Sequence, residues 1–126
     1  MGDDGRIIRI LVCGSRHWTD YKAIVRQLRP YAPHCIVIHG AARGADSLAG
    51  RAADALGMSV EDYPADWSAY GRRAGVLRNQ RMLDEGKPDL VFAFTPDMER
   101  SRGTRDMVTR ARKQGVRVFV YGDAYA

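Results

Sequence analysis

One stretch of the sequence limits the possible folds more than any other. It consists of a short β-branched run, a glycine-containing loop and the start of a helical pattern. The run is Val37-Ile38-His39, the glycine loop follows at residues 40–44, and the helical pattern starts at Ala45. From Ala45 onward, apolar or small residues recur at i, i+3, i+4 and i+7, which is the spacing of one face of an amphipathic helix. The stretch therefore predicts a strand, a tight loop and a helix, with the loop backbone aimed along the helix axis.

This glycine loop is also a candidate anion site. The N–H groups at a helix N-terminus carry roughly half a positive charge and favour anions. Gly40 and Gly44 lack the Cβ atoms that would keep a phosphate away from the backbone, and Arg43 adds a planar, permanently charged donor. For this stretch alone, the less favoured alternative is an ordinary glycine turn in a small α/β domain.

Strands and helices alternate along the whole chain, although no segment of sequence is repeated. Apolar strands are predicted at Ile7–Cys13, Cys35–His39, Asp89–Thr95 and Arg117–Tyr121, with a shorter mixed strand at Ser59–Pro64. Helices are predicted at residues 21–29, 45–56, 72–85 and 103–114. Near-continuous apolar strands are typical of a parallel sheet that is covered on both faces. The alternation therefore predicts an α/β fold, a doubly wound parallel sheet of about five strands with helices on both faces.

The length and composition limit the class of protein. A chain of 126 residues is expected to form one domain, with its core at about residues 7–121 and a flexible N-terminus at residues 1–6. No apolar run reaches the roughly 18 residues of a membrane span, and no signal-type segment precedes the first strand, so we expect a cytoplasmic protein with no membrane partner. Cys13 and Cys35 lie beside apolar β-formers without metal-ligand spacing, so we expect buried thiols, no metal and no cofactor. The net charge of +5 is scattered along the chain and does not by itself select a nucleic-acid partner.

Three glycine-bearing loops follow the ends of predicted strands. In an open parallel sheet such loops meet at one edge, and ligands bind there at the point where the strand order reverses. The candidate residues in the three loops are Gly14, Ser15 and Arg16; Gly40, Ala41, Arg43, Gly44 and Asp46; and Gly103, Thr104 and Asp106. Their backbone donors, hydroxyls and arginines together predict an anion site. For Asp46 and Asp106 taken singly, the alternative is a carboxylate in a helix first turn, worth roughly 0.3–1 kcal/mol.

The connection at residues 65–71 holds two aromatic residues, Trp67 and Tyr70. They are candidates for a lid or stacking wall over this site. Surface aromatics packed over the edge of the core are the alternative.

Several motifs together resemble the SLOG superfamily, specifically its YspA-like group known as DUF2493. They are Gly14-Ser15-Arg16, residues 39–46, Ala65-Asp66-Trp67, residues 75–82, Pro88-Asp89 and residues 103–107. The resemblance covers roughly residues 7–121 and implies a Rossmann-like fold, a nucleotide-derived ligand and a homodimer. It brings Asn79, within the motif at residues 75–82, into the candidate binding set. More distant relatives are the lonely-guy phosphoribohydrolases, which activate cytokinins, and the DNA-processing protein A family, which handles single-stranded DNA.

The chain departs from the phosphoribohydrolase branch in one motif. The pattern Pro-Gly-Gly-x-Gly-Thr-x-x-Glu is matched only at Gly103 and Thr104, because Arg100-Ser101-Arg102 replaces the double glycine and Met107 holds the glutamate position. Asp106 lies one residue before that position. Arg78, together with Met82, is similar to the arginine-bearing helix motif of that branch. The departure disfavours glycosidic hydrolysis and leaves the binding features intact.

Three functions follow from these observations. The favoured one is binding of a nucleoside phosphate or an ADP-ribose-like molecule, as a sensor or sequestering module, with phosphate on the loops at residues 40–46 and 103–104. The second is an N-glycoside hydrolase of nucleoside monophosphates, in which Arg78 holds phosphate and Asp106 is the catalytic carboxylate. The third, less favoured, is binding of single-stranded nucleic acid through the scattered arginines, with Trp67 stacking on a base.

Overall fold

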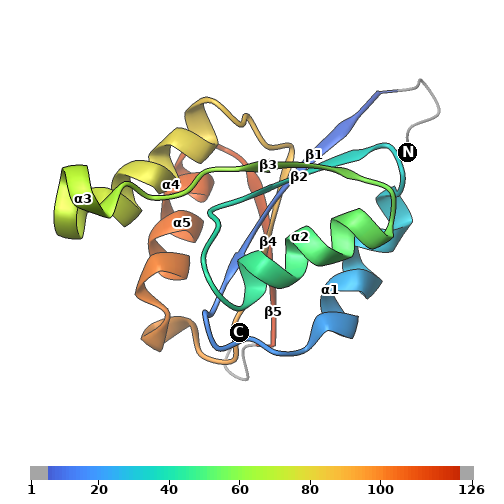
Figure 1. The fold of residues 1–126 in the computed structure, drawn as a ribbon, viewed down its shortest axis with the longest axis horizontal. Helices are drawn as coiled ribbons and strands as arrows, with labels where there is room; N and C mark the ends of the chain where they lie inside the picture. The colour runs from blue at the N-terminus through green and yellow to red at the C-terminus, as the bar shows by residue number, and fades with distance from the viewer. Residues whose placement is uncertain (1–5, 123–126) are drawn as a thin grey trace.

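A five-stranded parallel sheet forms the centre of the computed structural model, which describes residues 6–122 (Figure 1). The strands are β1 (Ile8–Gly14), β2 (Cys35–His39), β3 (Ser59–Asp62), β4 (Leu90–Phe94) and β5 (Arg117–Tyr121). Their order across the sheet is β3-β2-β1-β4-β5, and every neighbouring pair is parallel. The predicted doubly wound parallel sheet is confirmed. Residues 1–5 of the expected flexible N-terminus lie outside the described residues.

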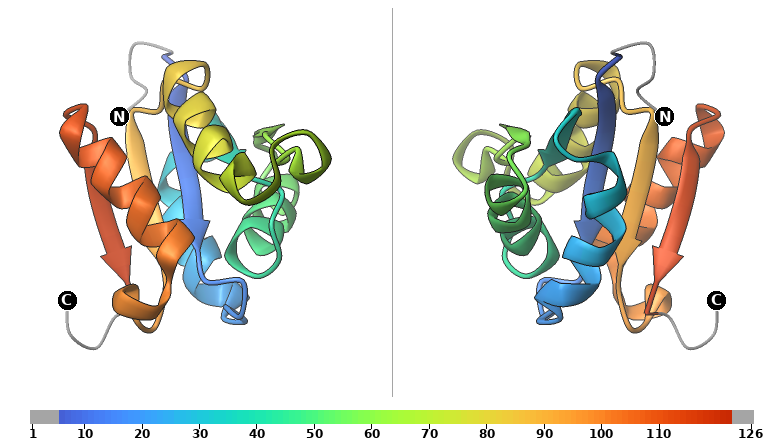
Figure 2. Two further views of the ribbon diagram at one scale, coloured as in Figure 1. Left: turned by 90° about the vertical axis from the view of Figure 1, so that its left-hand side faces the viewer. Right: turned by 90° about the vertical axis from the view of Figure 1, so that its right-hand side faces the viewer.

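Helices cover both faces of this sheet (Figure 2). The helices are α1 (Tyr21–Leu28), α2 (Ala45–Ala55), α3 (Trp67–Tyr70), α4 (Ala74–Asp84) and α5 (Arg102–Lys113), with short 3₁₀ turns η1 (Arg29–Tyr31), η2 (Gly71–Arg73) and η3 (Met98–Arg100). The core on one face is built from β-strand side chains together with α1 and α2. The core on the other face uses α4 and α5. Among residues 6–122, no helix is long and apolar enough to cross a bilayer.

The central strand β1 contributes side chains to the cores on both faces of the sheet, which explains its nearly continuous apolar sequence. Ile10 and Val12 point into the core beneath α1 and α2, whereas Leu11 and Cys13 point into the core beneath α4 and α5. Successive side chains of a strand alternate between faces, so a strand that is covered on both faces needs apolar residues at every position. Cys13 and Cys35 are buried free thiols, as predicted, and burial raises the pKa of Cys35 to about 12.

The segment between β3 and α4 differs from the sequence prediction. One helix was predicted at residues 72–85 after a loop, but the structure has the additional helix α3, whose N-cap Asp66 accepts from the Ala69 N–H at 3.0 Å. Gly71 has a φ of +56°, which lies outside the right-handed helical region and ends α3 before α4 begins at Ala74. As a result α3 lies at one end of the molecule, beyond the end of α4 (Figure 1).

The strand order places the carboxyl end of β1 between those of β2 and β4. After β1 the chain continues outward to β2 and β3, and it then returns to the other side of β1 with β4 and β5. The strand order therefore reverses between β1 and β4, which is the position where open α/β sheets bind ligands.

Candidate functional site

A cavity of about 420 Å³ lies at the carboxyl edge of the sheet, between the loops that follow β1 and β4. It brings together most of the residues singled out from the sequence. Those that line it are Gly14, Ser15, Arg16, Asp46, Arg78, Asn79, Gly103 and Thr104. Of the two aromatic residues proposed as a wall, Trp67 lines the cavity and is 59% exposed. Residues from five separate segments of the chain therefore meet where the strand order reverses.

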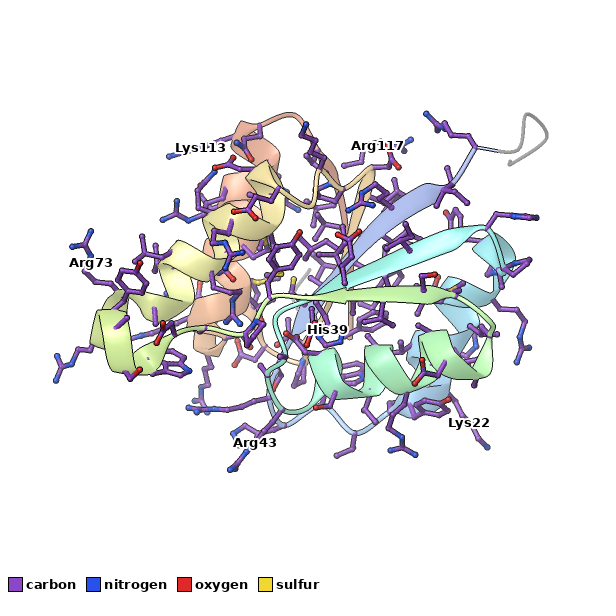
Figure 3. All side chains as sticks on the ribbon, turned by 45° about the horizontal axis from the view of Figure 1, so that its top comes forward. Lys22, His39, Arg43, Arg73, Lys113 and Arg117 are labelled. Carbon is purple, nitrogen blue, oxygen red and sulfur yellow. The ribbon has the colours of Figure 1, made fainter. Side chains whose placement is uncertain are left out.

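The other five candidate residues lie outside the cavity lining, and Figure 3 labels one of them. Arg43 is exposed and extends away from the body of the protein, whereas His39, the last residue of β2 directly before the loop, lies in the interior. Gly40 packs against the guanidinium group of Arg78, and Gly44 packs against the backbone of the β1–α1 loop. The remaining two, Ala41 and Asp106, are engaged in hydrogen bonds with other side chains.

The β2–α2 loop directs three consecutive backbone amides onto protein side chains. The N–H groups of Gly40 and Ala42 donate to Oδ2 of Asp46, at 2.8 and 3.5 Å. The N–H of Ala41, which has a φ of +59°, donates to Nδ1 of His39 at 2.9 Å. Three amides of this loop are thus engaged by the protein itself, although α2 has no side-chain cap.

Asp46 is the carboxylate around which this loop turns. It lies in the first turn of α2 and is only 6% exposed. Burial raises the pKa of Asp46, while the hydrogen bond from the Gly40 amide and the charges of His39 and Arg78 act in the opposite direction. A buried acceptor is therefore held in a fixed position at the cavity by its own loop.

Close backbone packing explains the glycines at positions 14 and 44. A Cβ on Gly44 would lie 2.5 Å from the carbonyl carbon of Arg16, and the φ of Gly44 is +70°. A Cβ on Gly14 would overlap the carbonyl oxygen of Phe94 and lie 2.8 Å from the Cβ of Ala45. Next to these contacts, the Ala45 N–H donates to the Ser15 carbonyl at 3.1 Å. The start of α2 is thereby joined directly to the end of β1.

Gly103 differs from both of these glycines. A Cβ added there would meet nothing within 4 Å, although Gly103 lies in the first turn of α5 and lines the cavity. Glycine in a helix is less stable than alanine by about 1 kcal/mol. No atom of residues 6–122 requires the absence of a Cβ at Gly103, and the space beside it is open.

The N-terminus of α5 faces the cavity without a side-chain cap. Arg102, Gly103 and Thr104 of its first turn all line the cavity. The N-cap residue Ser101 directs its hydroxyl elsewhere, to Oγ1 of Thr95 at 2.6 Å and to a backbone carbonyl. No side chain in the described part of the chain caps this helix, so its first N–H groups remain available to an anion.

Arg78 reaches the cavity from α4. Its Nη1 donates to the carbonyls of Gly40 and Tyr63, and its Nε donates to Oδ1 of Asn79 at 3.1 Å. No described residue accepts from Nη2, which is the nitrogen left for a ligand. Burial lowers the pKa of Arg78 and the charge of Asp46 opposes this, but a guanidinium remains protonated at any pH of interest.

Asn79 connects Arg78 to α5. It is 5% exposed, and its Nδ2 donates to the Gly103 carbonyl at 3.2 Å and to Oδ2 of Asp106 at 3.0 Å. Asp106 also accepts from Nε of Arg110 at 2.9 Å. Asp106 therefore belongs to the interface between α4 and α5. All the hydrogen-bonding groups of the Asn79 side chain have protein partners, so this residue positions its neighbours.

Positive charge dominates the cavity. Arg16, Arg78, Arg100 and Arg102 line it, while Asp46 is the single carboxylate among the described residues that do so. Arg100 and Arg102 were not predicted to lie at the site, although they shortly precede the candidate Gly103, because they replace the double glycine of the phosphoribohydrolase motif. Also not predicted from the sequence were Cys13, His17, Ala42, Met82 and Ser101. Among residues 6–122, no three His, Cys, Asp or Glu side chains gather closely enough to hold a metal ion.

Comparison with known proteins supports the same assignment of fold and family. The solved structure of DNA processing protein A from Streptococcus pneumoniae superimposes with a TM-score of 0.70 at 16% identity, covering 90% of this chain and 50% of that one. That likeness concerns the fold, and this chain spans about half the length of that protein. In sequence, the Gene 61 protein of Mycobacterium phage D29 is 38% identical over 124 residues, covering 91% of this chain and 97% of the phage protein. The family model for YspA, cpYpsA-related SLOG proteins matches residues 8–70. The chain therefore belongs to the YspA, cpYpsA-related SLOG family.

Proposed function

We propose that this protein binds a nucleotide-derived phosphate ligand, a nucleoside phosphate or an ADP-ribose-like molecule, and acts as a sensor or sequestering module. The observation that carries the proposal is the uncapped N-terminus of α5, which faces the cavity between arginines. Aligned N–H groups, a helix dipole and guanidinium groups all favour a phosphate at the same place.

The phosphate is assigned to α5 and not to α2. Asp46 is a buried carboxylate in the first turn of α2 and accepts from the preceding loop amides of Gly40 and Ala42, so a phosphate at α2 would lie beside its negative charge. Neither helix has a side-chain cap, but Gly103 in the first turn of α5 leaves room for an oxygen to approach the backbone, whereas Gly44 before α2 is closely packed. Nη2 of Arg78 and the side chain of Arg102 supply further donors at the same cavity.

The remainder of the cavity suits a nucleoside. Its volume of about 420 Å³ falls in the range of about 300–1,000 Å³ that is typical of small-molecule sites. Trp67 is more than half exposed and lines the cavity, so its ring is available for stacking against a base.

Binding without hydrolysis is favoured by the position of Asp106. Both of its oxygens accept from Nε of Arg110, and one of them also accepts from Asn79. Asp106 does not line the cavity, so it has no route to a glycosidic bond held there. The resemblance to phosphoribohydrolases is thus matched in the phosphate-binding features and not in the carboxylate.

A ligand panel with product analysis tests the proposal. The probes are the four ribonucleoside 5′-monophosphates, ADP-ribose, inorganic phosphate and a single-stranded oligonucleotide. We expect at least one mononucleotide or ADP-ribose to raise the unfolding midpoint, because a ligand at 100 times its Kd adds about 2.7 kcal/mol to the free energy of unfolding. Stabilisation by the oligonucleotide alone would support nucleic-acid binding instead. Release of free base from a mononucleotide, detected by chromatography, would show that the protein is a hydrolase.

A further inference from the structure

The buried carboxylate of Asp46 is the feature of the cavity that phosphate binding does not explain. Asp46 lines the cavity among arginines and is 6% exposed. Its Oδ2 is held by the amides of Gly40 and Ala42, and no described residue donates a hydrogen bond to its Oδ1. A carboxylate that keeps one oxygen without a protein donor at a ligand cavity is an acceptor ready for a ligand.

The chemistry of a carboxylate limits what it can contact. An ionised carboxylate only accepts hydrogen bonds, so a group that touches Oδ1 must donate one, and a phosphate would be repelled. The hydrogen bonds to Oδ2 fix the side chain before any ligand arrives, so little conformational freedom is lost on binding. Hydroxyl and amino groups are the donors that fit this requirement.

The positions of the lining residues distinguish between these donors. Asp46 and Cys13 are nearly buried, at 6% and 7% exposed, whereas Trp67 is 59% exposed. The deep part of the cavity therefore holds the carboxylate, and the aromatic surface suited to a base lies at its opening. In a nucleotide the ribose lies between the phosphate and the base. With the phosphate at α5 and the base at Trp67, the ribose hydroxyls are the donors placed to reach Asp46.

We propose that Asp46 accepts a hydrogen bond from a ribose hydroxyl of the ligand, so that the site selects ribonucleotides over deoxyribonucleotides. This inference rests on the proposed nucleotide-binding function and narrows it to ribose-bearing phosphates. In this arrangement, protein groups of opposite charge contact two different parts of one ligand. The arginines and the start of α5 hold the phosphate, and Asp46, from a helix on the other face of the sheet, holds the sugar.

Calorimetric titration with matched ligands tests the inference. The probes are the four ribonucleoside 5′-monophosphates and their 2′-deoxy, 3′-deoxy and 2′-fluoro counterparts. Removing the hydroxyl that Asp46 contacts should weaken binding at least about tenfold, which corresponds to about 1.4 kcal/mol. If the contact is to the 2′-hydroxyl, the 2′-fluoro compounds should bind as weakly as the 2′-deoxy compounds, because fluorine keeps the size of a hydroxyl but cannot donate.

The variant Asp46→Asn assigns the preference to this residue. Its amide oxygen can replace Oδ2 as the acceptor for the Gly40 amide, while its amide nitrogen replaces the charged oxygen that faces the ligand. The preference for ribose should fall below about threefold in this variant. Asp54→Asn is the matched control, because Asp54 is an exposed carboxylate on the same helix and should leave the preference unchanged.

The outcomes separate this inference from the function on which it rests. Measurable binding with equal affinity for ribonucleotides and both deoxy series would overturn the inference and leave the proposed function standing. Full ribose preference in a folded Asp46→Asn variant would remove Asp46 from the role. If Asp46→Asn does not fold, the titrations of the unaltered protein with the deoxy and fluoro compounds still decide whether a donating hydroxyl is required. Failure to bind every ribonucleotide here, together with failure to bind ADP-ribose in the ligand panel, would overturn both.

Discussion

Gly103 and Gly44 are both glycines at helix starts, yet the structure gives them different reasons to be glycine. Gly44 has a positive φ and no room for a Cβ, whereas Gly103 is helical and has open space beside it. At Gly44 the protein fold itself requires glycine. At Gly103 the requirement comes from the ligand that we propose.

We predict opposite effects of alanine at these two positions. Gly103→Ala should raise the free energy of unfolding, by up to about 1 kcal/mol, because alanine is the better helix former. The same change should weaken mononucleotide binding about tenfold, since a methyl group would lie between the phosphate and the backbone. Gly44→Ala should lower the free energy of unfolding by more than about 1 kcal/mol. Denaturant unfolding and calorimetric titration measure both quantities, and an unchanged affinity in Gly103→Ala would move the phosphate away from α5.

Asp46 makes the stability of the protein depend on pH, and its burial sets the direction. Burial raises its pKa in the folded protein, so the folded state binds this proton more tightly than the unfolded chain, where an aspartate titrates near about 3.9. The contribution of Asp46 to the free energy of unfolding therefore falls as the pH rises from about 4 through the raised pKa, and the loss is complete above it.

The variant Asp46→Asn should remove this pH-dependent component. Relative to the unaltered protein, its free energy of unfolding should increase steadily as the pH rises from about 4 to about 7. Urea unfolding at a series of pH values measures the difference. Two curves that remain parallel over this range would show that the carboxylate is not destabilised by burial.

At the scale of elements, α4 and α5 are joined by a network that includes Asp106, the candidate catalytic carboxylate of the hydrolase hypothesis. Asn79 donates to Asp106, and Arg110 donates to Asp106 and, through Nη1, to Gln80 at 2.9 Å. Arg110 and Asp106 are each about one third exposed, at 32% and 28% of their side chains, so solvent screens much of their attraction.

We predict that Asp106→Asn has a small structural effect and no chemical one. The amide oxygen can still accept from Asn79, while the charge partner of Arg110 is lost, so the free energy of unfolding should fall by about 1 kcal/mol or less. Mononucleotide affinity should change less than about threefold. Chemical unfolding and product analysis on the unaltered protein and the variant provide the measurement, and base release that disappears in the variant would contradict the binding role.

The strands were predictable from the sequence because their side chains must satisfy two cores at once. Leu11 and Val12 serve opposite faces, and few structures besides a covered parallel strand need apolar side chains at every position of so short a run. Helix α3 was not predicted, since four residues carry no periodicity and its start depends on one hydrogen bond to Asp66. Local pattern thus determined the long elements but not the short one.

The sequence predicted which loops meet at one edge of the sheet, but it did not predict which atoms in them form hydrogen bonds. That the loops after β1 and β2 share one edge with Gly103 follows from parallel order alone. That Arg78 bonds to the Gly40 carbonyl, 38 residues away, could not be inferred from spacing, and neither could the capture of the loop amides by Asp46. These contacts depend on how two folded loops meet, and they determine which loop amides remain available to a ligand.

Across the whole molecule, the net charge of +5 attracts any anion, whether an oligonucleotide or a mononucleotide, without selecting between them. Salt dependence separates the two cases. An oligonucleotide whose phosphates contact several arginines releases condensed counterions and should lose affinity with a logarithmic slope of about −0.7 for each phosphate contacted, whereas a mononucleotide carries a single phosphate group and no such counterion atmosphere.

We predict that mononucleotide affinity changes only slightly with salt. Calorimetric titrations at about 50 and 200 mM salt measure this for a mononucleotide and, as a control, for a single-stranded oligonucleotide. A steep slope for the oligonucleotide, with no response to any mononucleotide, would contradict the small-ligand assignment.

We propose that phosphate binds at the start of α5 and not at the β2–α2 loop, whose amides at Gly40 and Ala42 already donate to Asp46. Backbone amide NMR spectra recorded during titration with a ribonucleoside 5′-monophosphate test it most directly, because an amide that donates to phosphate shifts strongly. We expect large shifts for the amides of Gly103 and Thr104, and much smaller ones for Gly40 and Ala42, which already donate to Asp46. Large shifts in the β2–α2 loop, with none in the first turn of α5, would contradict it.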